Sequence, residues 1–304
     1  MKTTSLLSTI LAALVLAAPV LAQQDFSEVE IETIPVSDGI YMLMGGSGGN
    51  IGLSVGKDGA FLVDDQYAPL SEKILAAVAE QSDAPIEFVV NTHWHPDHAE
   101  GNENMGAMGA VLVAHENVRE RMSTTQFIQA FGMEVLPSPA GALPVITFDD
   151  GVTLHWNGDE IRIFHVAPAH TDGDAVIHFV NADVIHTGDI YFNGLYPFID
   201  VGTGGRFDGM IAATDAILEI AGENTKIIPG HGPLSNRAQL QAYRDMLVTV
   251  RGRISAMVEE GMDREAVVAA APTSDLDAVW GGGFLQPDMW VGIAYDALTV
   301  DVHE

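Results

Sequence analysis

Short apolar runs separated by turn residues fill the first part of the chain. They predict β-strands over residues 29–36, 39–44, 50–55 and 60–64. From 69 to 80, a starting proline is followed by Ile74, Leu75 and Val78 at helical spacing, which predicts a helix. The mostly apolar run 86–90 fits a strand that is buried on both faces.

The same order of strands and helices then repeats. Further strands are predicted over 111–114, 152–156, 160–167, 175–180, 184–187 and 226–229, and helices over 115–122, 207–221 and 235–260. Residues 123–143 are rich in Pro, Ser and Gly, which predicts irregular structure. Two successive units of strands and helices favour two sheets packed face to face with helices outside. We therefore predict one domain over 23–260 and a helical extension over 261–304 packed on it.

The first 22 residues have the pattern of a secretory signal peptide. Lys2 precedes an apolar run over 6–20, and Val20 and Ala22 lie at positions −3 and −1 of a cleavage site. The run is shorter than the roughly 20 residues that span a bilayer, so a membrane anchor is the less favoured interpretation. We expect a mature protein that begins near Gln23, is periplasmic or secreted, and has no membrane attachment.

The charge of the chain limits its partners. The 304 residues include 13 Lys and Arg against 42 Asp and Glu, for a formal net charge of −29. Nucleic-acid affinity comes largely from Lys and Arg that displace counterions, so we expect no nucleic-acid partner. We attribute most of the charge to a solvated surface adapted to salty surroundings. Because such a chain repels anions, we expect a small-molecule substrate that is neutral or weakly charged.

The chain contains no cysteine. This excludes a disulfide framework, a thiolate nucleophile and any zinc site with sulfur ligands. Metal chemistry in this chain must therefore use histidine and carboxylate ligands.

Five of the eleven histidines lie in patterns typical of metal ligands. In the run NTHWHPDH, His93 and His95 are two residues apart, so on an extended segment both side chains point the same way. Pro96 is expected to stop the backbone from continuing as strand or helix, and Asp97 and His98 then point in another direction. One loop thus offers two ligands to one cation and two to a neighbour, as in two-metal sites with ions roughly 3.5–4 Å apart.

Three further candidate ligands each follow an apolar run and lie in a Gly-rich turn. They are His170 in PAHTDGD, Asp189 in HTGD and His231 in PGHG. Loops at strand ends cluster around clefts, so these residues are expected to meet the HWHPDH loop. Nitrogen and oxygen ligands suit zinc best, and iron and manganese also accept them. Asp64, at the end of another run, either orients a ligand histidine or simply ends a strand.

With these residues the sequence resembles the metallo-β-lactamase superfamily. The matching motifs are THWHPDH (92–98), His170, TGD ending at Asp189, and PGHG around His231, and the resemblance covers most of 36–235. It implies an αββα sandwich of two mixed sheets flanked by helices, with a dinuclear zinc site at one edge. It also implies that the first metal is bound by His93, His95 and His170, the second by Asp97, His98 and His231, and that Asp189 bridges the two.

The ligand set is that of the glyoxalase II and lactonase branches of this superfamily. The commonest β-lactamase subclass has cysteine at the position of Asp189 and a lysine in the loop that follows. This chain has no cysteine, and Arg206 is the only cation within 190–206. Weak β-lactamase activity is the most that this resemblance implies.

The ligands predict a mechanism. Two metal ions lower the pKa of a bridging water toward neutrality, which supplies a hydroxide nucleophile. Asp97 is the predicted catalytic residue, which orients this nucleophile and relays its proton to the leaving group. Trp94, Tyr191 and Asn193 are the predicted substrate contacts, with Tyr191 or Asn193 donating to the oxyanion. For the aromatic side chains, packing between loop and sheet is the alternative interpretation.

Three functions remain open on this basis. The leading one is a dizinc hydrolase that cleaves an amide, lactone or ester bond. The second is a thioesterase of the glyoxalase II kind, although the tail lacks a Lys/Arg cluster for a glutathione-like carboxylate. The third is a non-hydrolytic di-iron protein, but di-iron relatives usually carry glutamate where His95 stands.

Overall fold

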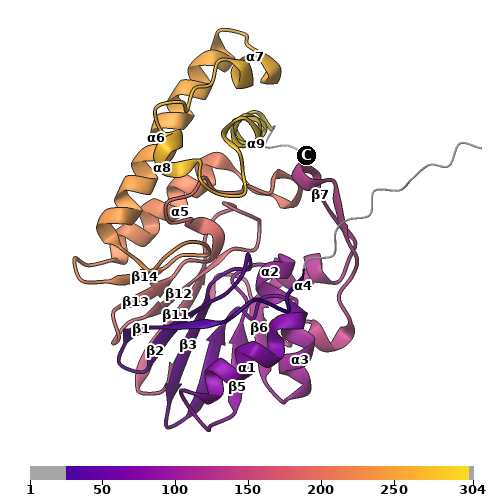
Figure 1. Ribbon diagram of the computed structural model, residues 1–304, viewed down its shortest axis with the longest axis vertical. Helices are drawn as coiled ribbons and strands as arrows, with labels where there is room; N and C mark the ends of the chain where they lie inside the picture. The colour runs from indigo at the N-terminus through magenta and orange to yellow at the C-terminus, as the bar shows by residue number, and fades with distance from the viewer. Residues whose placement is uncertain (1–24, 301–304) are drawn as a thin grey trace, which may run out of the picture.

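Two mixed β-sheets lie face to face and helices cover both outer sides, which gives the four layers of an αββα sandwich (Figure 1). The computed structural model describes residues 25–300. The predicted signal peptide, residues 1–22, lies outside the described residues. Within residues 25–300, no helix is both long enough and apolar enough to cross a membrane.

The first sheet has the strand order β1-β2-β3-β4-β5-β6-β9. Its strands are β1 (Glu32–Ser37), β2 (Ile40–Met44), β3 (Ile51–Gly56), β4 (Gly59–Val63), β5 (Ile86–Val90), β6 (Val111–His115) and β9 (Ile146–Phe148). Strands β1 to β4 pair antiparallel, and β4, β5, β6 and β9 pair parallel. Helices α1 (Ser71–Ala79) and α3 (Asn102–Ala107) cover its outer face, and the short helices α2 (Pro96–Ala99) and α4 (Glu116–Met122) follow β5 and β6.

The second sheet has the order β10-β11-β12-β13-β14-β15 and is antiparallel except for the pair β13-β14. Its strands are β10 (Gly151–Trp156), β11 (Asp159–His165), β12 (Ala175–Phe179), β13 (Val184–His186), β14 (Lys226–Ile228) and β15 (Ser235–Asn236). Its outer face is covered by α5 (Phe207–Ile220), α6 (Arg237–Glu259) and α9 (Pro287–Thr299). Helices α7 (Arg264–Ala269) and α8 (Asp277–Trp280) lie between α6 and α9 in the sequence.

The segment 123–143, predicted to be irregular, contains a small antiparallel pair of strands. Strands β7 (Gln126–Ile128) and β8 (Met133–Val135) pair only with each other among the described strands, and we call residues 126–136 the β7–β8 arm. Each strand has three residues, which is too short for an alternating pattern to be detected in the sequence. The short helices α2 and α3 and the strand β9 were missed for the same reason.

An apolar core between the two sheets holds them together. Strands β4 and β12 each carry one phenylalanine on the inner face. These two residues, Phe61 and Phe179, meet edge to face with ring centroids 6.0 Å apart. Ile161, Ile163 and Val184 of the second sheet complete this layer, and all are buried. The two sheets are thereby held face to face, and their edges become the place where the strand-end loops meet.

The helices after residue 261 pack on α5, α6 and the loop before η5, a 3-10 turn over Val201–Thr203. The Trp290 ring stacks on Tyr196 with centroids 4.0 Å apart, and its indole N–H donates to the Pro197 carbonyl at 2.6 Å. The Tyr196 hydroxyl donates to the Asp277 carboxylate at 2.8 Å. The extension therefore anchors the loop segment that leads to Phe198.

Candidate metal centre

Loops from both sheets meet at one edge of the sandwich. β5 of the first sheet leads to His93, while β11, β13 and β14 of the second sheet lead to His170, Asp189 and His231. The Ala175 backbone N–H donates to the Thr92 carbonyl at 2.9 Å, which ties the loops of the two sheets together. All seven predicted ligands lie at this edge, in two neighbouring groups.

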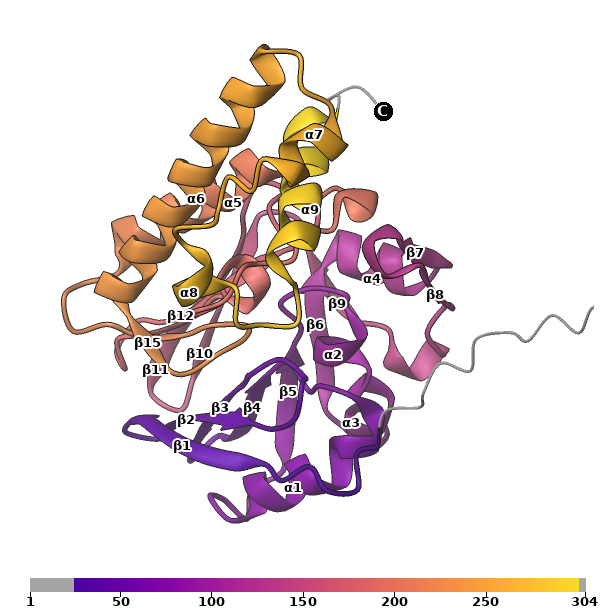
Figure 2. The ribbon, with the colours of Figure 1, turned by 45° about the horizontal axis from the view of Figure 1, so that its top comes forward.

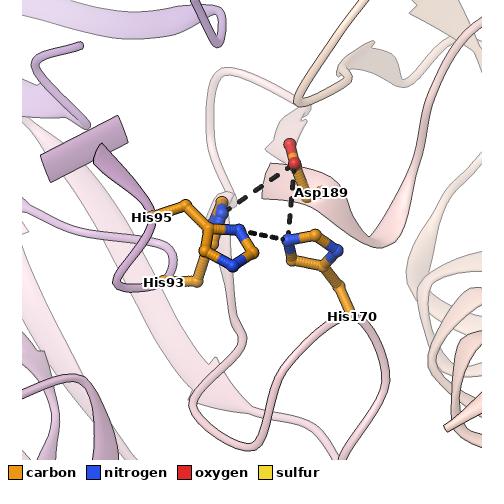
Figure 3. Close-up of side chains that lie close together, drawn as sticks. All are labelled: His93, His95, His170 and Asp189. Carbon is orange, nitrogen blue, oxygen red and sulfur yellow. Dashed lines mark hydrogen bonds and ion pairs between the residues drawn. The ribbon is translucent and has the colours of Figure 1, made fainter. Parts of the chain in front are cut away.

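The first group lies deepest. It consists of His93, His95, His170 and Asp189, whose side chains point toward one another (Figure 3). Oδ2 of Asp189 lies 3.5 Å from Nε2 of His170 and 3.8 Å from Nε2 of His93. Nδ1 of His95 lies 2.9 Å from Nε2 of His170. Every member is buried.

The second group consists of Asp97, His98 and His231. Oδ2 of Asp97 lies 3.3 Å from Nε2 of His231 and 3.7 Å from Nε2 of His98. The other oxygen of Asp189, Oδ1, faces this group, at 3.1 Å from His98 and 3.5 Å from His231. The carboxylate of Asp189 therefore presents one oxygen to each group.

The residues fit a pair of metal ions. Nε2 of His93 and Oδ1 of Asp189 are buried and make no hydrogen bond among the described residues, a state that costs free energy unless another ligand satisfies them. Ligand atoms of a tetrahedral zinc ion, with Zn–N near 2.0–2.1 Å, are separated by roughly 3.3–3.4 Å. The 2.9–3.8 Å separations in the two groups bracket that value. The donor set of imidazole and carboxylate suits zinc, iron or manganese.

Hydrogen bonds from outside fix the ring orientations. Nδ1 of His98 lies 2.8 Å from Oδ2 of Asp64, so Asp64 is the acceptor behind a ligand histidine, one of its two predicted roles. Nδ1 of His170 donates to the carbonyl of Phe198 at 2.8 Å. Such partners set which nitrogen of each imidazole faces a metal.

Asp200 lies behind His95 and was not identified from the sequence. Its Oδ2 is 3.0 Å from Nε2 of His95, and it also accepts a hydrogen bond from the Thr203 hydroxyl at 2.6 Å. Asp200 follows no motif and lies eleven residues beyond Asp189, in a loop whose path is set by the C-terminal helices. Only its contact with His95 in the folded structure reveals the role.

The protonation of the two groups differs. Burial lowers the pKa of His170 to about 4 and holds the pKa of His93 well below its ordinary value. In the second group burial also opposes the charged form, but the carboxylates of Asp189 and Asp97 raise the pKa of His231 to about 9. Burial opposes the ionised form of Asp189 too, yet the charges of His98, His231 and His170 hold its pKa well below the ordinary range. Burial thus favours the neutral imidazole of His93 and of His170, which is the form that binds metals.

Two glycines allow the loops to approach this closely. A Cβ on Gly49 would lie 2.1 Å from Cε1 of His98, and one on Gly230 would lie 2.0 Å from Oδ1 of Asp189. Asn50 then fixes the His231 loop, because its side-chain amide donates to the carbonyls of Pro229 and Gly232. The glycine cluster 45–49, at the connection of β2 and β3, is therefore part of the wall of the site.

A cavity of about 840 Å³ opens in front of the second group. Asp97, Asp189 and His231 line its floor together with His95. Asp97 is 21% exposed and His231 14%, whereas the imidazoles of His93 and His170 are fully buried. A substrate therefore approaches from the side of Asp97 and His231.

The three predicted substrate contacts lie elsewhere. Tyr191 is fully buried, and its hydroxyl donates to the Asn193 side chain and contacts the Ser235 hydroxyl. The Asn193 amide donates to the Pro233 carbonyl, and the Trp94 indole N–H donates to the Thr203 hydroxyl. None of Trp94, Tyr191 and Asn193 is among the described residues that line the cavity, and all three are buried. Their role as substrate contacts stays a prediction.

Pro96 differs from the expectation. It ends the extended segment, as expected, but it is the first residue of helix α2 rather than a break in regular structure. Proline suits the first position of a helix, where its missing N–H has no intrahelical partner. Helix α2 carries Asp97 and His98, which meet His231 in the second group.

The geometry agrees with a family match over most of the domain. Residues 44–231 match the family model described as the metallo-beta-lactamase superfamily, which is more than half of the chain. This chain belongs to the metallo-beta-lactamase superfamily. The αββα fold implied by the sequence motifs is thus confirmed.

Solved structures share the fold at low sequence identity. The DIM-1 metallo-beta-lactamase has a TM-score of 0.58 and 18% identity, covering 73% of this chain and 99% of its own. A metallo-beta-lactamase from Pontibacter korlensis is similar, with a TM-score of 0.58 and 16% identity over 72% of this chain and 99% of its own. The inverting sec-alkylsulfatase Pisa1 from Pseudomonas sp. has a TM-score of 0.65 and 18% identity, covering 88% of this chain and 50% of its own.

Curated relatives are similar over part of their length. A hydroxyacylglutathione hydrolase from Pelagibacter ubique is 24% identical over 167 residues, which is 54% of this chain and 59% of the relative. The cytoplasmic isozyme of hydroxyacylglutathione hydrolase from Saccharomyces cerevisiae is 28% identical over 183 residues, 57% of this chain and 58% of the relative. The chain thus spans somewhat less than three fifths of the length of each.

Proposed function

We propose that the protein is a metal-dependent hydrolase with two zinc ions, which cleaves an ester, lactone or amide bond of a neutral small molecule. One observation carries the proposal: the two carboxylate oxygens of Asp189 face two separate groups of imidazoles. A buried carboxylate in this position suits a bridge between two cations, and its Oδ1 makes no hydrogen bond within residues 25–300. Membership of the superfamily and the similarity to two hydrolases support the same activity.

The chain's own residues divide the work. One ion would be held by His93, His95 and His170. The other would be held by Asp97, His98 and His231, and Asp189 would contact both ions. When bound, such ions polarise a carbonyl and lower the pKa of water so that it attacks at neutral pH. Asp97 lies on the cavity floor beside His231, where its carboxylate can orient the attacking water and carry a proton to the leaving group.

The charge of the cavity supports a neutral substrate. Among the described residues, those that line the cavity include the carboxylates of Asp97, Glu100, Glu134 and Asp189 but no lysine or arginine. Two divalent ions would bring a charge of about +4, equal in sum to the four carboxylates. They would be held at Asp97 and Asp189, however, and the two glutamates are not among the candidate metal ligands. An anionic group of a substrate would therefore find no cationic side chain there.

A glutathione thioester is the second candidate substrate, because both curated relatives are hydroxyacylglutathione hydrolases. The acidic cavity wall favours the first candidate, since glutathione carries carboxylates. A non-hydrolytic di-iron protein has less support, because His95 occupies the first group as a fourth buried member. We also infer export to the periplasm or medium, which rests on the leader pattern of residues 1–22.

Metal analysis and a substrate panel test the proposal. We expect purified protein to contain about two zinc ions per chain, to hydrolyse neutral esters or lactones, and to lose this activity with a chelator. The panel should include a β-lactam, a glutathione thioester and a phosphodiester. Abundant iron without zinc, or no hydrolysis of any panel member by zinc-loaded protein, would overturn the proposal.

A further inference from the structure

We propose that the cavity binds an extended apolar group of the substrate, and that Phe284 of the C-terminal segment determines this specificity together with Phe131. The inference rests on the proposed hydrolase function and names its substrate class: a neutral ester, lactone or amide whose acyl part is long and apolar. It also gives a function to the segment after residue 261.

Three phenyl rings from distant parts of the sequence form a wall beside the metal centre. Phe198 precedes η5, Phe131 lies in the β7–β8 arm, and Phe284 lies in the loop before α9. All three line the same cavity. The ring of Phe131 lies 4.9 Å from Phe198 and 6.1 Å from Phe284, between centroids.

The wall begins at the ligands themselves. The Phe198 ring is 5.8 Å from His95 and stacked on it, and the Phe284 ring is 6.4 Å from His231. A group bound against this wall would therefore be continuous with a carbonyl placed at Asp97 and His231. Figures 1 and 2 both show helix α9, which follows the loop that carries Phe284, near strand β7 of the β7–β8 arm.

Two of these rings, and a leucine of the same arm, are exposed and therefore available to a ligand. Phe284 is 55% exposed and Phe131 is 42% exposed, and Leu136 beside them on the arm is 70% exposed. Each exposes apolar surface to water. A ligand that covered this surface would make the free energy of binding more favourable by about 25 cal/mol per Å². Single exposed apolar residues are ordinary, but a group gathered at the mouth of a cavity marks a binding site.

The acidic residues of the cavity wall disfavour a substrate tail that ends in an anionic group. Glu100 and Glu134 line the same cavity as these rings, and no described lining residue is Lys or Arg. A carboxylate or phosphate at the end of the substrate tail would meet two carboxylates and no partner. The volume of about 840 Å³ is within the range that holds ligands of several hundred daltons, so an extended neutral chain has room.

The position of Phe284 is set by its two neighbours in the chain. Gly283 lies against Leu195, and the next residue but one, Leu285, is buried in the core. Phe284 is thus projected outward between two anchored neighbours. Its exposure is a consequence of this anchoring and not of a loose loop.

The experiment uses the full zinc-loaded protein and a series of p-nitrophenyl esters from acetate to octanoate. We expect kcat/KM of the wild type to rise by about two- to fourfold for each added methylene. In Phe284→Ala and Phe131→Ala, the ratio of kcat/KM for octanoate over acetate should fall by about tenfold each, because most of one ring's contact area is lost. Phe127→Ala is the matched control, since Phe127 is a 53% exposed phenylalanine of the same arm outside the cavity wall.

A binding measurement without turnover completes the test. N-phenyl-1-naphthylamine, a neutral apolar fluorophore, should bind the wild type and Phe127→Ala alike, and bind Phe284→Ala and Phe131→Ala about tenfold more weakly. Hydrolysis of the series with no dependence on chain length, and equal fluorophore binding in all variants, would overturn the inference while the hydrolase function stands. Hydrolysis of no ester or lactone at all would instead count against the proposed function, and fluorophore binding would then decide the apolar site by itself.

Discussion

Nε2 of His95 lies 3.0 Å from Oδ2 of Asp200, and this contact decides which nitrogen of His95 faces the metal centre. Its Nδ1 is thereby turned toward Nε2 of His170, 2.9 Å away. His93 and His170 present Nε2 to Asp189 instead. The first group therefore depends on a carboxylate that is not itself one of its ligands.

Removing that carboxylate should weaken the first metal. We expect Asp200→Ala to lower zinc affinity by about 10- to 100-fold, because His95 loses the partner that fixes its ring. Competition with a chromogenic chelator measures this affinity. Asp208→Ala, which removes a 63% exposed carboxylate paired with Arg251, is the control and should not change it. Equal affinities in both variants would show that Asp200 does not orient His95.

Asp97 should be needed for turnover. We expect Asp97→Ala to lower kcat by at least about 100-fold on whichever ester or lactone is the best substrate, since both a ligand and a proton carrier are lost. Asp215→Ala is the control, because Asp215 is paired with Arg244 outside the site. If hydrolysis by Asp97→Ala stays within a few fold of the wild type at full zinc loading, the assigned role of Asp97 is wrong.

Gly49 should be required for the second metal. Its Cβ would lie 2.1 Å from Cε1 of His98, so Gly49→Ala must displace that imidazole. We expect zinc bound per chain to fall from about two to about one, because only the second group loses a ligand. Gly252→Ala provides the control: Gly252 lies in helix α6 with open space around it, and alanine there should stabilise the fold by up to about 1 kcal/mol. Unchanged zinc content in Gly49→Ala would contradict the tight approach.

Trp290 should stabilise the fold and the metal centre together. Trp290→Phe keeps a ring against Tyr196 but leaves the buried Pro197 carbonyl without its donor. We expect the free energy of unfolding to fall by about 1–3 kcal/mol. Urea denaturation measures it. Val279→Ala, at a 63% exposed position of α8, should change it little. If Trp290→Phe were as stable as the wild type, the proposed anchoring would be refuted.

Salt should stabilise the chain. A net charge of −29 makes the folded state repel itself, and raising the ionic strength from 0.1 to 1 M shortens the Debye length from about 10 to about 3 Å. We therefore expect the melting temperature to rise over this range. Exposed ion pairs such as Arg251–Asp208 weaken with salt, but 13 basic residues against 42 acidic ones leave repulsion dominant. A melting temperature that is independent of sodium chloride would refute salt adaptation.

The sequence predicted the metal-ligand set because local chemistry marks it. His93 and His95 follow a buried strand at alternating positions, and Asp189 and His231 each lie in a Gly-rich turn after an apolar run. The structure brings these residues together in the two expected groups. Most long strands and helices were also predicted, since their periodicity extends over five or more residues.

Tertiary structure alone decided the surroundings of that set. Tyr191 follows Asp189 closely in the sequence, but its side chain is buried in the core. Phe284 comes about 95 residues after Asp189, yet its ring lies beside His231. Asp200 reaches His95 from a loop that the Tyr196–Trp290 stack holds in place. The periodicity of a sequence reports which face of its own element is buried, and motifs report which atoms can bind a metal. Which side chain from another element completes the wall depends on how helices and sheets pack, and no short window of sequence contains that information.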